Sequence, residues 1–137
     1  PRGQPAMPKD PLKEQIAKLM ASHEALALTS EEIGDQGAKY IAGYLKDNTT
    51  VTDLDLEYNG ITDAGAQALF KALRTNTTLT ALHLPNNEIT PKCLPSMRTM
   101  FEKNQTLHFL TLTGNQIDDD EEAMGQISQW VEMPGEG

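Results

Sequence analysis

Cysteine, aromatic residues and long apolar runs are scarce in this 137-residue chain. Its one cysteine, Cys93, has no partner for an internal disulfide, which favours a reducing compartment over a secreted, disulfide-rich module. No apolar run approaches the roughly 18 residues that a membrane-spanning helix needs. The first residues are polar and proline-containing, unlike the apolar segment of a secretory signal peptide. These absences predict a cytoplasmic protein that does not associate with a membrane.

Basic residues are also few, because 11 Lys and Arg stand against 20 Asp and Glu, for a net charge of −9. Broad nucleic-acid binding and docking on anionic lipid both need a basic surface, so we expect neither. The length suits one domain, and it is long enough to bury a core without disulfides or metal.

A 28-residue period organises the chain. Pairs of leucines two residues apart recur at this spacing, as do single isoleucines and asparagines. The columns in phase are Leu26/Leu28, Leu54/Leu56, Leu82/Leu84 and Leu110/Leu112; Ile33, Ile61, Ile89 and Ile117; Asn59, Asn87 and Asn115; and Asn48, Asn76 and Asn104. A fixed period of this length predicts a solenoid of stacked units.

Each unit has a strand half and a helix half. The Leu-x-Leu pattern predicts a short strand with both leucines on one face. Apolar residues spaced by three and four, such as Ala66, Leu69 and Leu73, predict a helix with one apolar face. Helix starts are expected at Thr62, Thr90 and Asp118, which are good N-cap residues. Acids after Asp118 would complement the helix dipole, so the acidic run 118–122 is interpreted as a helix start rather than a calcium site.

The unit L-x-L-x-x-N-x-I-x-x-x-G-A-x-x-L-x-x-x-L-x-x-N resembles the ribonuclease-inhibitor-like leucine-rich repeat, which is shared by ribonuclease inhibitors, Ran GTPase activators, NOD-like receptors and tropomodulins. The copy that starts at Leu54 carries it best. The resemblance implies an α/β solenoid of about four 28-residue units, with a parallel sheet on the concave face and helices on the convex face. It also implies that the Asn59 column bonds to backbone in the loops after the strands.

The predicted domain covers residues 10–132, between a proline-containing flexible tail at 1–9 and a second tail at 133–137. A cap helix at 10–22 precedes the repeats 23–50, 51–78, 79–106 and 107–132, and a helix ending near Trp130 closes the other end. We expect a monomer or part of a longer chain.

Several residues depart from their columns. Glu31 stands where the other copies have a loop asparagine, and Cys93 stands where two copies have glycine, which predicts an inert, packed thiol. His23 falls in a column of large apolar residues and is expected to pack at the edge of a repeat. The Asn-x-Thr triplets at 48, 76 and 104 match glycosylation acceptors, but we interpret these asparagines as helix terminators in the left-handed conformation.

The residues between the strand leucines are expected to face the concave side. They form an asymmetric surface. An acidic strip, made of Asp53, Asp55 and Glu57, lies with a tyrosine beside a histidine and an aromatic ring, while most Lys and Arg fall in helices. Ala81 is expected on the same face. The candidate partner-binding residues are Asp53, Asp55, Glu57, Tyr58, His83 and Phe109.

These features predict a non-catalytic module that binds another protein, through a basic segment of that partner. No Ser/His/Asp, Cys/His or paired-His pattern points to catalysis, and no cofactor or metal is expected. Two alternatives stay open. One is a small-GTPase regulator that contacts its GTPase near Asn59 and Asn87. The other is a cytoskeletal assembly module similar to tropomodulin.

Overall fold

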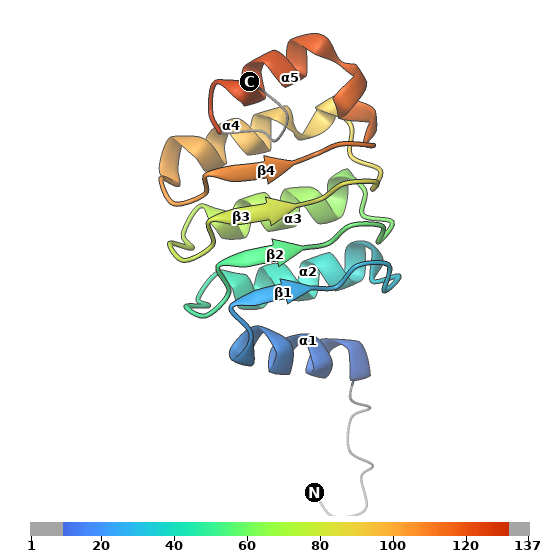
Figure 1. Ribbon diagram of the computed structural model, residues 1–137, viewed down its shortest axis with the longest axis vertical. Coiled ribbons are helices and arrows are strands. Elements are labelled where there is room, and N and C mark those ends of the chain that lie inside the picture. Colours follow the sequence, from blue (N-terminus) through green and yellow to red (C-terminus); the bar gives the residue numbers. More distant parts are fainter. Residues whose placement is uncertain (1–9, 132–137) are drawn as a thin grey trace, which may run out of the picture.

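The computed structural model describes residues 10–131, which alternate between strands and helices along one array (Figure 1). Both predicted tails, and residue 132, lie outside these residues. The elements in chain order are α1 (Pro11–Ser22), β1 (Ala25–Ala27), α2 (Gly34–Leu45), β2 (Asp53–Asp55), α3 (Asp63–Leu73), β3 (Ala81–His83), the 3-10 helix η1 (Pro91–Cys93), α4 (Leu94–Lys103), β4 (Phe109–Thr111), the 3-10 helix η2 (Gln116–Asp119) and α5 (Glu121–Ser128).

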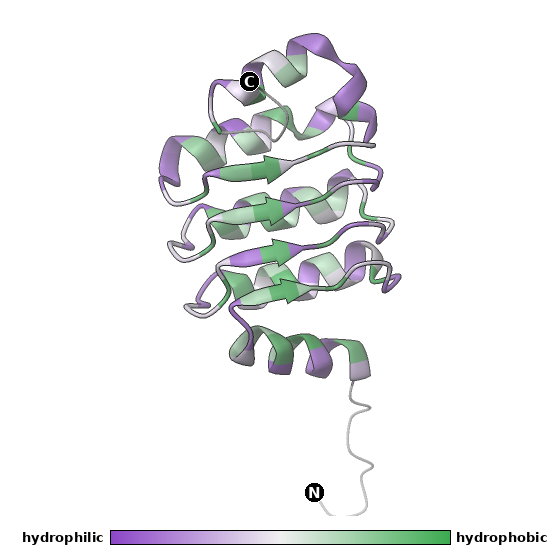
Figure 2. Ribbon diagram, viewed as in Figure 1, coloured by the Kyte–Doolittle hydropathy of each residue, from purple (hydrophilic) through white to green (hydrophobic). Residues whose placement is uncertain are grey.

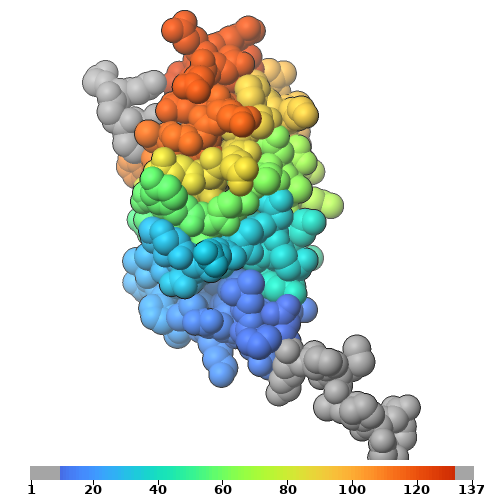
Figure 3. Space-filling model, turned by 90° about the vertical axis from the view of Figure 1, so that its right-hand side faces the viewer, coloured from blue at the N-terminus to red at the C-terminus, as the bar shows by residue number. Residues whose placement is uncertain are grey.

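The four strands form an open parallel sheet in the order β1-β2-β3-β4. Its register follows the sequence period, because Leu26 pairs with Leu54, Leu54 with Leu82, and Leu82 with Leu110. The helices lie together behind one face of the sheet, and the units stack in chain order (Figures 1 and 3). The predicted α/β solenoid of about four units is therefore confirmed. None of the helices between residues 10 and 131 has the length and apolar character needed to cross a bilayer.

The core lies between the sheet and the helices. Every leucine of the repeated strand pairs is at most 8% exposed, and the middles of the strands are hydrophobic in Figure 2. From the helix side, Ile41, Leu69 and Met97 close over these leucines and are fully buried. Neither layer could bury its apolar face alone, so each unit depends on its neighbours.

Buried asparagines hold the loops that follow the strands. The Asn87 side-chain oxygen accepts from the backbone N–H groups of Asn59 and Ile61, both at 3.0 Å, and its amide donates to the Leu56 carbonyl oxygen at 3.0 Å. Asn59 and Asn115 each reach the preceding unit in the same way. The expected bonds from this column to loop backbone are present.

A second asparagine column, Asn48, Asn76 and Asn104, holds the other end of each unit, but its backbone does not have the expected conformation. The Asn76 side-chain oxygen accepts from Thr78 and Leu79, while its amide donates to the Leu45 carbonyl oxygen. None of these asparagines has positive φ, and Asn104 is extended at φ −95°. The predicted left-handed conformation is wrong, because an extended backbone lets the side chain bond forward and backward at once.

A ladder of aspartates and threonines, missed in the sequence, joins consecutive helix starts. Asp35 accepts from the Thr62 N–H and hydroxyl at 2.7 and 2.6 Å, and Asp63 accepts from Thr90 likewise. In the last step of this ladder the Cys93 thiol lies 3.1 Å from Asp63 Oδ1. Burial, with the Asp63 carboxylate beside it, raises the pKa of the Cys93 thiol well above its ordinary range. The thiol is fully buried, which agrees with the predicted structural role.

The two ends of the array are built differently. Cap helix α1 packs on α2 through buried Ile16 and Met20, and the Tyr40 hydroxyl donates to Asp10, the N-cap of α1. His23, expected in a packed column, is exposed because it ends α1 and no repeat unit within residues 10–131 covers it; its ring bonds to the Leu19 carbonyl oxygen instead.

At the C-terminal end, the prediction that Asp118 caps a helix is wrong. Asp118 lies within η2, and Asp120 caps α5 by accepting from the Ala123 N–H at 3.0 Å. The extra 3-10 turn shifts the last helix along the chain. Trp130 packs its ring against Phe101, with centroids 5.9 Å apart.

Candidate functional site

Four of the six predicted site residues, Asp53, Asp55, His83 and Phe109, lie on the sheet face, meaning the side of the sheet opposite the helices, and Glu57 and Tyr58 follow β2 in its loop. Two rows of side chains cross the strands there in register. The first row is Ala25, Asp53, Ala81 and Phe109, and the second is Ala27, Asp55, His83 and Thr111. Ala81, expected to be exposed, is buried because its neighbours in the row, Asp53 and Phe109, are both larger. The two rows bring Asp53, Asp55 and His83 together on adjacent strands.

Polar contacts fix the middle of this surface. The His83 Nε2 atom lies 3.4 Å from Asp53 Oδ1, and its Nδ1 atom lies 3.0 Å from the Thr111 hydroxyl. Asp55 Oδ1 accepts from the Glu57 N–H at 3.0 Å. Thr111 was not among the predicted site residues, although its place 28 residues after His83 could have indicated the contact. His83 therefore links three strands and sets the position of the Asp53 carboxylate.

Two aromatic side chains flank the acidic strip. Tyr58 is 58% exposed and Phe109 is 43% exposed, and these are the exposed large apolar residues within the described range 10–131. Tyr58 lies in the turn after β2, whereas Phe109 begins β4. Adjacent strands are about 4.8 Å apart, so Phe109 lies about 10 Å from Asp53 across Ala81. Tyr58 thus follows the C-terminal end of the strip, whereas Phe109 lies two strands across from its first residue, Asp53.

Tyr58 occupies an unusual backbone conformation. Its φ is +57°, and the residues 28 positions before and after it, Ser30 and Asn86, have φ of +57° and +56°. The fourth position of this column is Gly114, with φ +79°. Residues with a side chain adopt this region at a cost, so a largely exposed tyrosine there is not explained by its own packing. The sequence offered one signal of this column, the glycine in its last copy.

Basic side chains are confined to the helix layer of the described residues, whereas acids occur in both layers. Every Lys and Arg in residues 10–131 lies in a helix or at its C-terminal cap; these are Lys13, Lys18, Lys39, Lys46, Lys71, Arg74, Lys92, Arg98 and Lys103. The strands and the loops beside them carry acids instead, namely Glu24, Glu31, Glu32, Asp53, Asp55, Glu57 and Glu88. Within residues 10–131 the acidic strip therefore has no lysine or arginine of its own layer beside it, and the imidazole of His83 contacts Asp53.

The loop asparagines cannot serve as a contact surface. Asn59 is 2% exposed and Asn87 is 7% exposed, with their amide groups bonded to backbone. The side chains near which a GTPase was expected to bind are thus interior, structural groups.

Comparisons with known proteins agree with the fold. A family model described as Leucine Rich repeat matches residues 47–70, 75–92 and 103–120. No curated protein matches the sequence.

Three solved structures illustrate the likeness of the fold. A structure titled "Leiomodin-1 Actin-Binding Site 2 (ABS2)" has a TM-score of 0.72 at 19% identity, covering 93% of this chain and 79% of that one. The tropomodulin C-terminal domain of Caenorhabditis elegans has a TM-score of 0.56 at 12% identity, covering 88% and 89%. The Chaetomium Mex67:Mtr2 subunits give 0.61 at 19% identity, covering 89% and 86%.

At these identities the structural likeness shows the fold alone. The family assignment rests on three features together: the matched repeats, the 28-residue register and the column of loop asparagines. The chain is built of leucine-rich repeats, and its 28-residue units are consistent with the ribonuclease-inhibitor-like type.

Proposed function

We propose that this chain is a non-catalytic protein-interaction module that binds a basic segment of a partner protein on its sheet face. The observation that supports this proposal is the placement of the charges: Asp53, Asp55 and Glu57 lie together on one strand and its loop, whereas all described Lys and Arg side chains belong to the helix layer. Leucine-rich-repeat domains are typical protein-binding modules, which supports the general class. A cytoplasmic location is part of the proposal.

The surface suits a basic, partly apolar segment for two physical reasons. Carboxylates two residues apart on one strand repel each other, and a Lys or Arg placed between them would relieve that repulsion. Exposed Tyr58 and Phe109 provide the aromatic area on which binding energy is usually concentrated. A partner that spans both rings would cross the whole strip.

The test compares three immobilised forms of the chain as baits for cell extract, with mass-spectrometric identification of bound proteins. One form is native. The second carries Asp53→Asn, Asp55→Asn and Glu57→Gln, and the control carries Asp47→Asn, Glu102→Gln and Glu122→Gln on exposed positions in or beside helices. Both variants lose three negative charges, so net charge cannot distinguish them.

We expect a prey that the native and control baits retain and the strip variant loses. Its basic segment, made as a labelled peptide, should then bind the native chain at 50 mM salt and more weakly at 300 mM salt. Equal recovery by all three baits would contradict the proposal.

A second candidate is an actin-associated assembly module, favoured by the likeness to a structure titled as the actin-binding site 2 of leiomodin-1. Co-sedimentation with filamentous actin tests it directly. Binding that survives the strip variant would place an actin contact elsewhere on the molecule, and no pelleting at all would remove this candidate.

A further inference from the structure

The N-terminal edge of the sheet is open along β1. This strand has one neighbour, β2, and it pairs with β2 through alternate residues: the Leu28 N–H donates to the Asp55 carbonyl oxygen at 2.9 Å, and the Glu24 carbonyl oxygen accepts from Thr52 at 2.8 Å. In a parallel ladder the residues between these direct their N–H and C=O groups to the opposite side. The backbone groups of Ala25 and Ala27 therefore face away from β2, where no described residue pairs with them.

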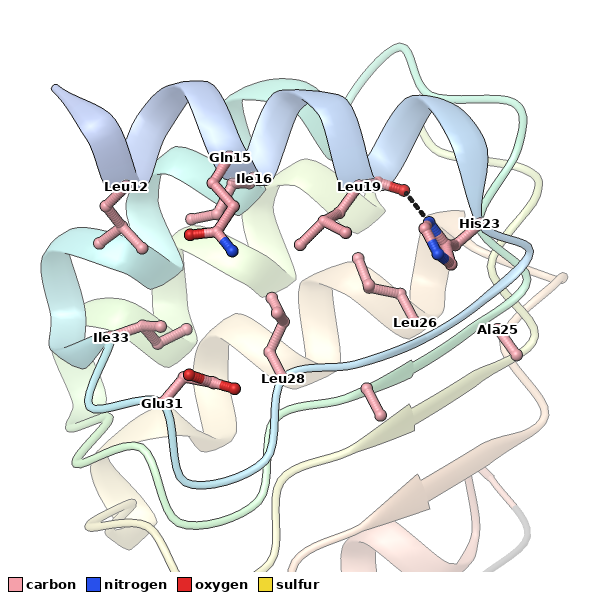
Figure 4. A pocket seen from close by; sticks show the side chains of 11 residues that line it. Leu12, Gln15, Ile16, Leu19, His23, Ala25, Leu26, Leu28, Glu31 and Ile33 are labelled. Atoms are coloured by element: carbon pink, nitrogen blue, oxygen red, sulfur yellow. Dashed lines mark hydrogen bonds between the residues drawn. The ribbon is translucent and has the colours of Figure 1, made fainter. Parts of the chain in front are cut away.

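A pocket with both apolar and polar lining residues lies directly beside this open edge. Its volume is about 310 Å³, and it separates β1 from the cap helix (Figure 4). Leu12 and Leu19 of α1 line one side, and Leu26 and Leu28 line the other. Whereas Ile16 and Met20 of the same helix are 1% exposed, Leu12 and Leu19 are only half-buried. The cap helix therefore covers the helix layer of the first unit and leaves a pocket on the strand side of its core, where Leu26 and Leu28 are 5% and 8% exposed.

The rest of the array shows what such an edge accepts. At each of the three strand pairs within the array, the two strands are parallel. The two leucines of one strand lie in register with the two leucines of its neighbour. Beyond the strand, the asparagine of the following unit accepts N–H groups from the preceding loop, as Asn59 does from Glu31 and Ile33. In the first unit this column holds Glu31, an exposed carboxylate that lines the same pocket. A group facing Glu31 would therefore meet a negative charge rather than a neutral amide.

We propose that this edge binds an extended segment of a partner protein with the pattern Leu-x-Leu-x-x-Lys or Leu-x-Leu-x-x-Arg, as an additional parallel strand beside β1. Its leucines enter the pocket between α1 and β1 in register with Leu26 and Leu28. Its main chain bonds to the outward groups of Ala25 and Ala27, whose small side chains leave the edge accessible. Its basic residue, five positions after the first leucine, faces Glu31. Such strand addition uses main-chain bonds for affinity and the pocket for selectivity.

This site is separate from the acidic strip, since strand addition uses the rim of β1 and not the sheet face of β2. The two proposals can therefore fail independently. The strip variant described above, with Asp53, Asp55 and Glu57 neutralised, serves as the control that should leave strand addition unchanged.

The experiment measures fluorescence anisotropy of a labelled 12-residue peptide that carries Leu-x-Leu-x-x-Lys among serine and threonine residues, titrated with the full chain. Two modified peptides accompany it. One is N-methylated at the two residues whose N–H groups would face β1, which removes the donors without changing the side chains. The other has serine in place of both leucines.

On the protein side, Ala27→Pro removes the outward N–H of β1, which β2 does not use, and Glu31→Lys reverses the charge that faces the basic residue. Proline is tolerated on an edge strand where its missing N–H faces outward. Glu102→Lys, on the exposed surface of α4, is the matched charge control.

We expect saturable binding of the parent peptide and at least fivefold weaker binding of both modified peptides. Ala27→Pro and Glu31→Lys should each weaken binding at least fivefold, and Glu102→Lys should not. If Ala27→Pro fails to fold by circular dichroism, the N-methylated peptide on the native chain decides the question. The proposal is overturned by equal affinity of the parent and N-methylated peptides, or by no binding at 1 mM. Self-association of the chain that the peptide fails to displace would likewise overturn it, because the edge would then belong to a second copy.

Discussion

The loop asparagines and the sheet-face acids form the most instructive contrast in this molecule. Both sets present side-chain oxygens at strand ends or beside strands. Asn59, Asn87 and Asn115 recur every 28 residues, are buried, and hold backbone of the neighbouring unit. By contrast, Asp53 lies between Ala25 and Ala81 in its row, and Asp55 lies between Ala27 and His83. The neighbouring units therefore have no acid at either position.

The contrast separates what the solenoid requires from what it only carries. A residue whose contacts are made to the next unit must recur in each unit, and its loss leaves buried backbone groups unpaired. A residue that faces solvent from one strand is free to vary, and an accumulation of one charge there is a candidate for recognition. The following experiments test this distinction, starting with the largest expected effect.

Asn87→Ala should destabilise the fold strongly. It removes the acceptor for the buried N–H groups of Asn59 and Ile61 and the donor to the Leu56 carbonyl oxygen. Because each unpaired buried group costs about 1–3 kcal/mol, the free energy of unfolding should fall by roughly 3 kcal/mol or more. Urea titration followed by circular dichroism measures it. Gln67→Ala removes an exposed amide from α3 and should change stability by less than about 0.5 kcal/mol; equal effects of the two would break the distinction.

Cys93 differs from the glycine that two other repeats have at its position, and experiments on it test whether such a difference marks a functional residue. Its pKa is raised by burial and by Asp63, so the unfolded chain ionises this thiol at lower pH than the folded chain does. Stability from the protonated thiol is complete below the ordinary thiol pKa of 9.0 and is lost as pH rises above it. The loss is at most about 1.4 kcal/mol per pH unit.

Urea titrations at pH 8, 9 and 10 on the native chain and on Cys93→Ser should therefore show a steeper decline for the native chain above pH 9. The pKa of Tyr40 is also raised, by its bond to Asp10, and this contributes equally to both proteins. Equal declines in the stability of the two proteins would indicate that the Cys93 thiol is accessible to solvent. The residue that differs from its column would then be a reactive group.

Tyr58→Gly should stabilise the fold and weaken partner binding. Tyr58 has φ of +57°, a conformation that costs a residue with a side chain about 1 kcal/mol and glycine almost nothing. Tyr58→Ala is the matched control, because it removes the ring but keeps the Cβ atom. We expect the free energy of unfolding of Tyr58→Gly to be higher than that of Tyr58→Ala by up to about 1 kcal/mol. Both variants should bind the prey peptide more weakly. A destabilised Gly variant would show that the ring supports the fold rather than recognition.

The periodic part of the molecule could be predicted from the sequence almost completely. Strand leucines, helix faces and the asparagine at 59, 87 and 115 recur in phase, because each makes its contacts across the same unit-to-unit interface. Two of the wrong predictions lie where the neighbour of a repeat is altered: among residues 10–131 only the cap helix precedes His23, and the helix start at Asp118 is displaced by an extra 3-10 turn in the last unit. The backbone of the Asn76 column was predicted wrongly within the regular part of the array, because the sequence does not show that its side chain bonds to two segments at once.

The candidate site was predictable only in part. Alternation placed Asp53, Asp55 and His83 on the sheet face, because side chains of a strand alternate between its faces. It does not account for Tyr58, whose exposure follows from the turn with positive φ after β2. The link from His83 to Thr111 and the burial of Ala81 depend on the sizes of neighbours in each row, which no single strand reveals. The open edge of β1 depends on how α1 docks, and the spacing of its leucines left that orientation undetermined.

The smallest expected change in stability belongs to the acidic strip itself. Asp53→Asn, Asp55→Asn and Glu57→Gln together keep the side-chain oxygen that Asp55 offers to the Glu57 N–H, and they cost only the partly exposed contact between His83 and Asp53. Such surface contacts are worth about 0–1 kcal/mol, and relief of like-charge repulsion offsets this, so the unfolding free energy should change by less than about 0.5 kcal/mol. Binding of a basic prey peptide should nevertheless fall at least tenfold. Loss of several kcal/mol in stability would instead place these carboxylates with the asparagines, as parts of the scaffold, and the difference between a repeated and a singular side-chain oxygen would no longer separate structure from recognition.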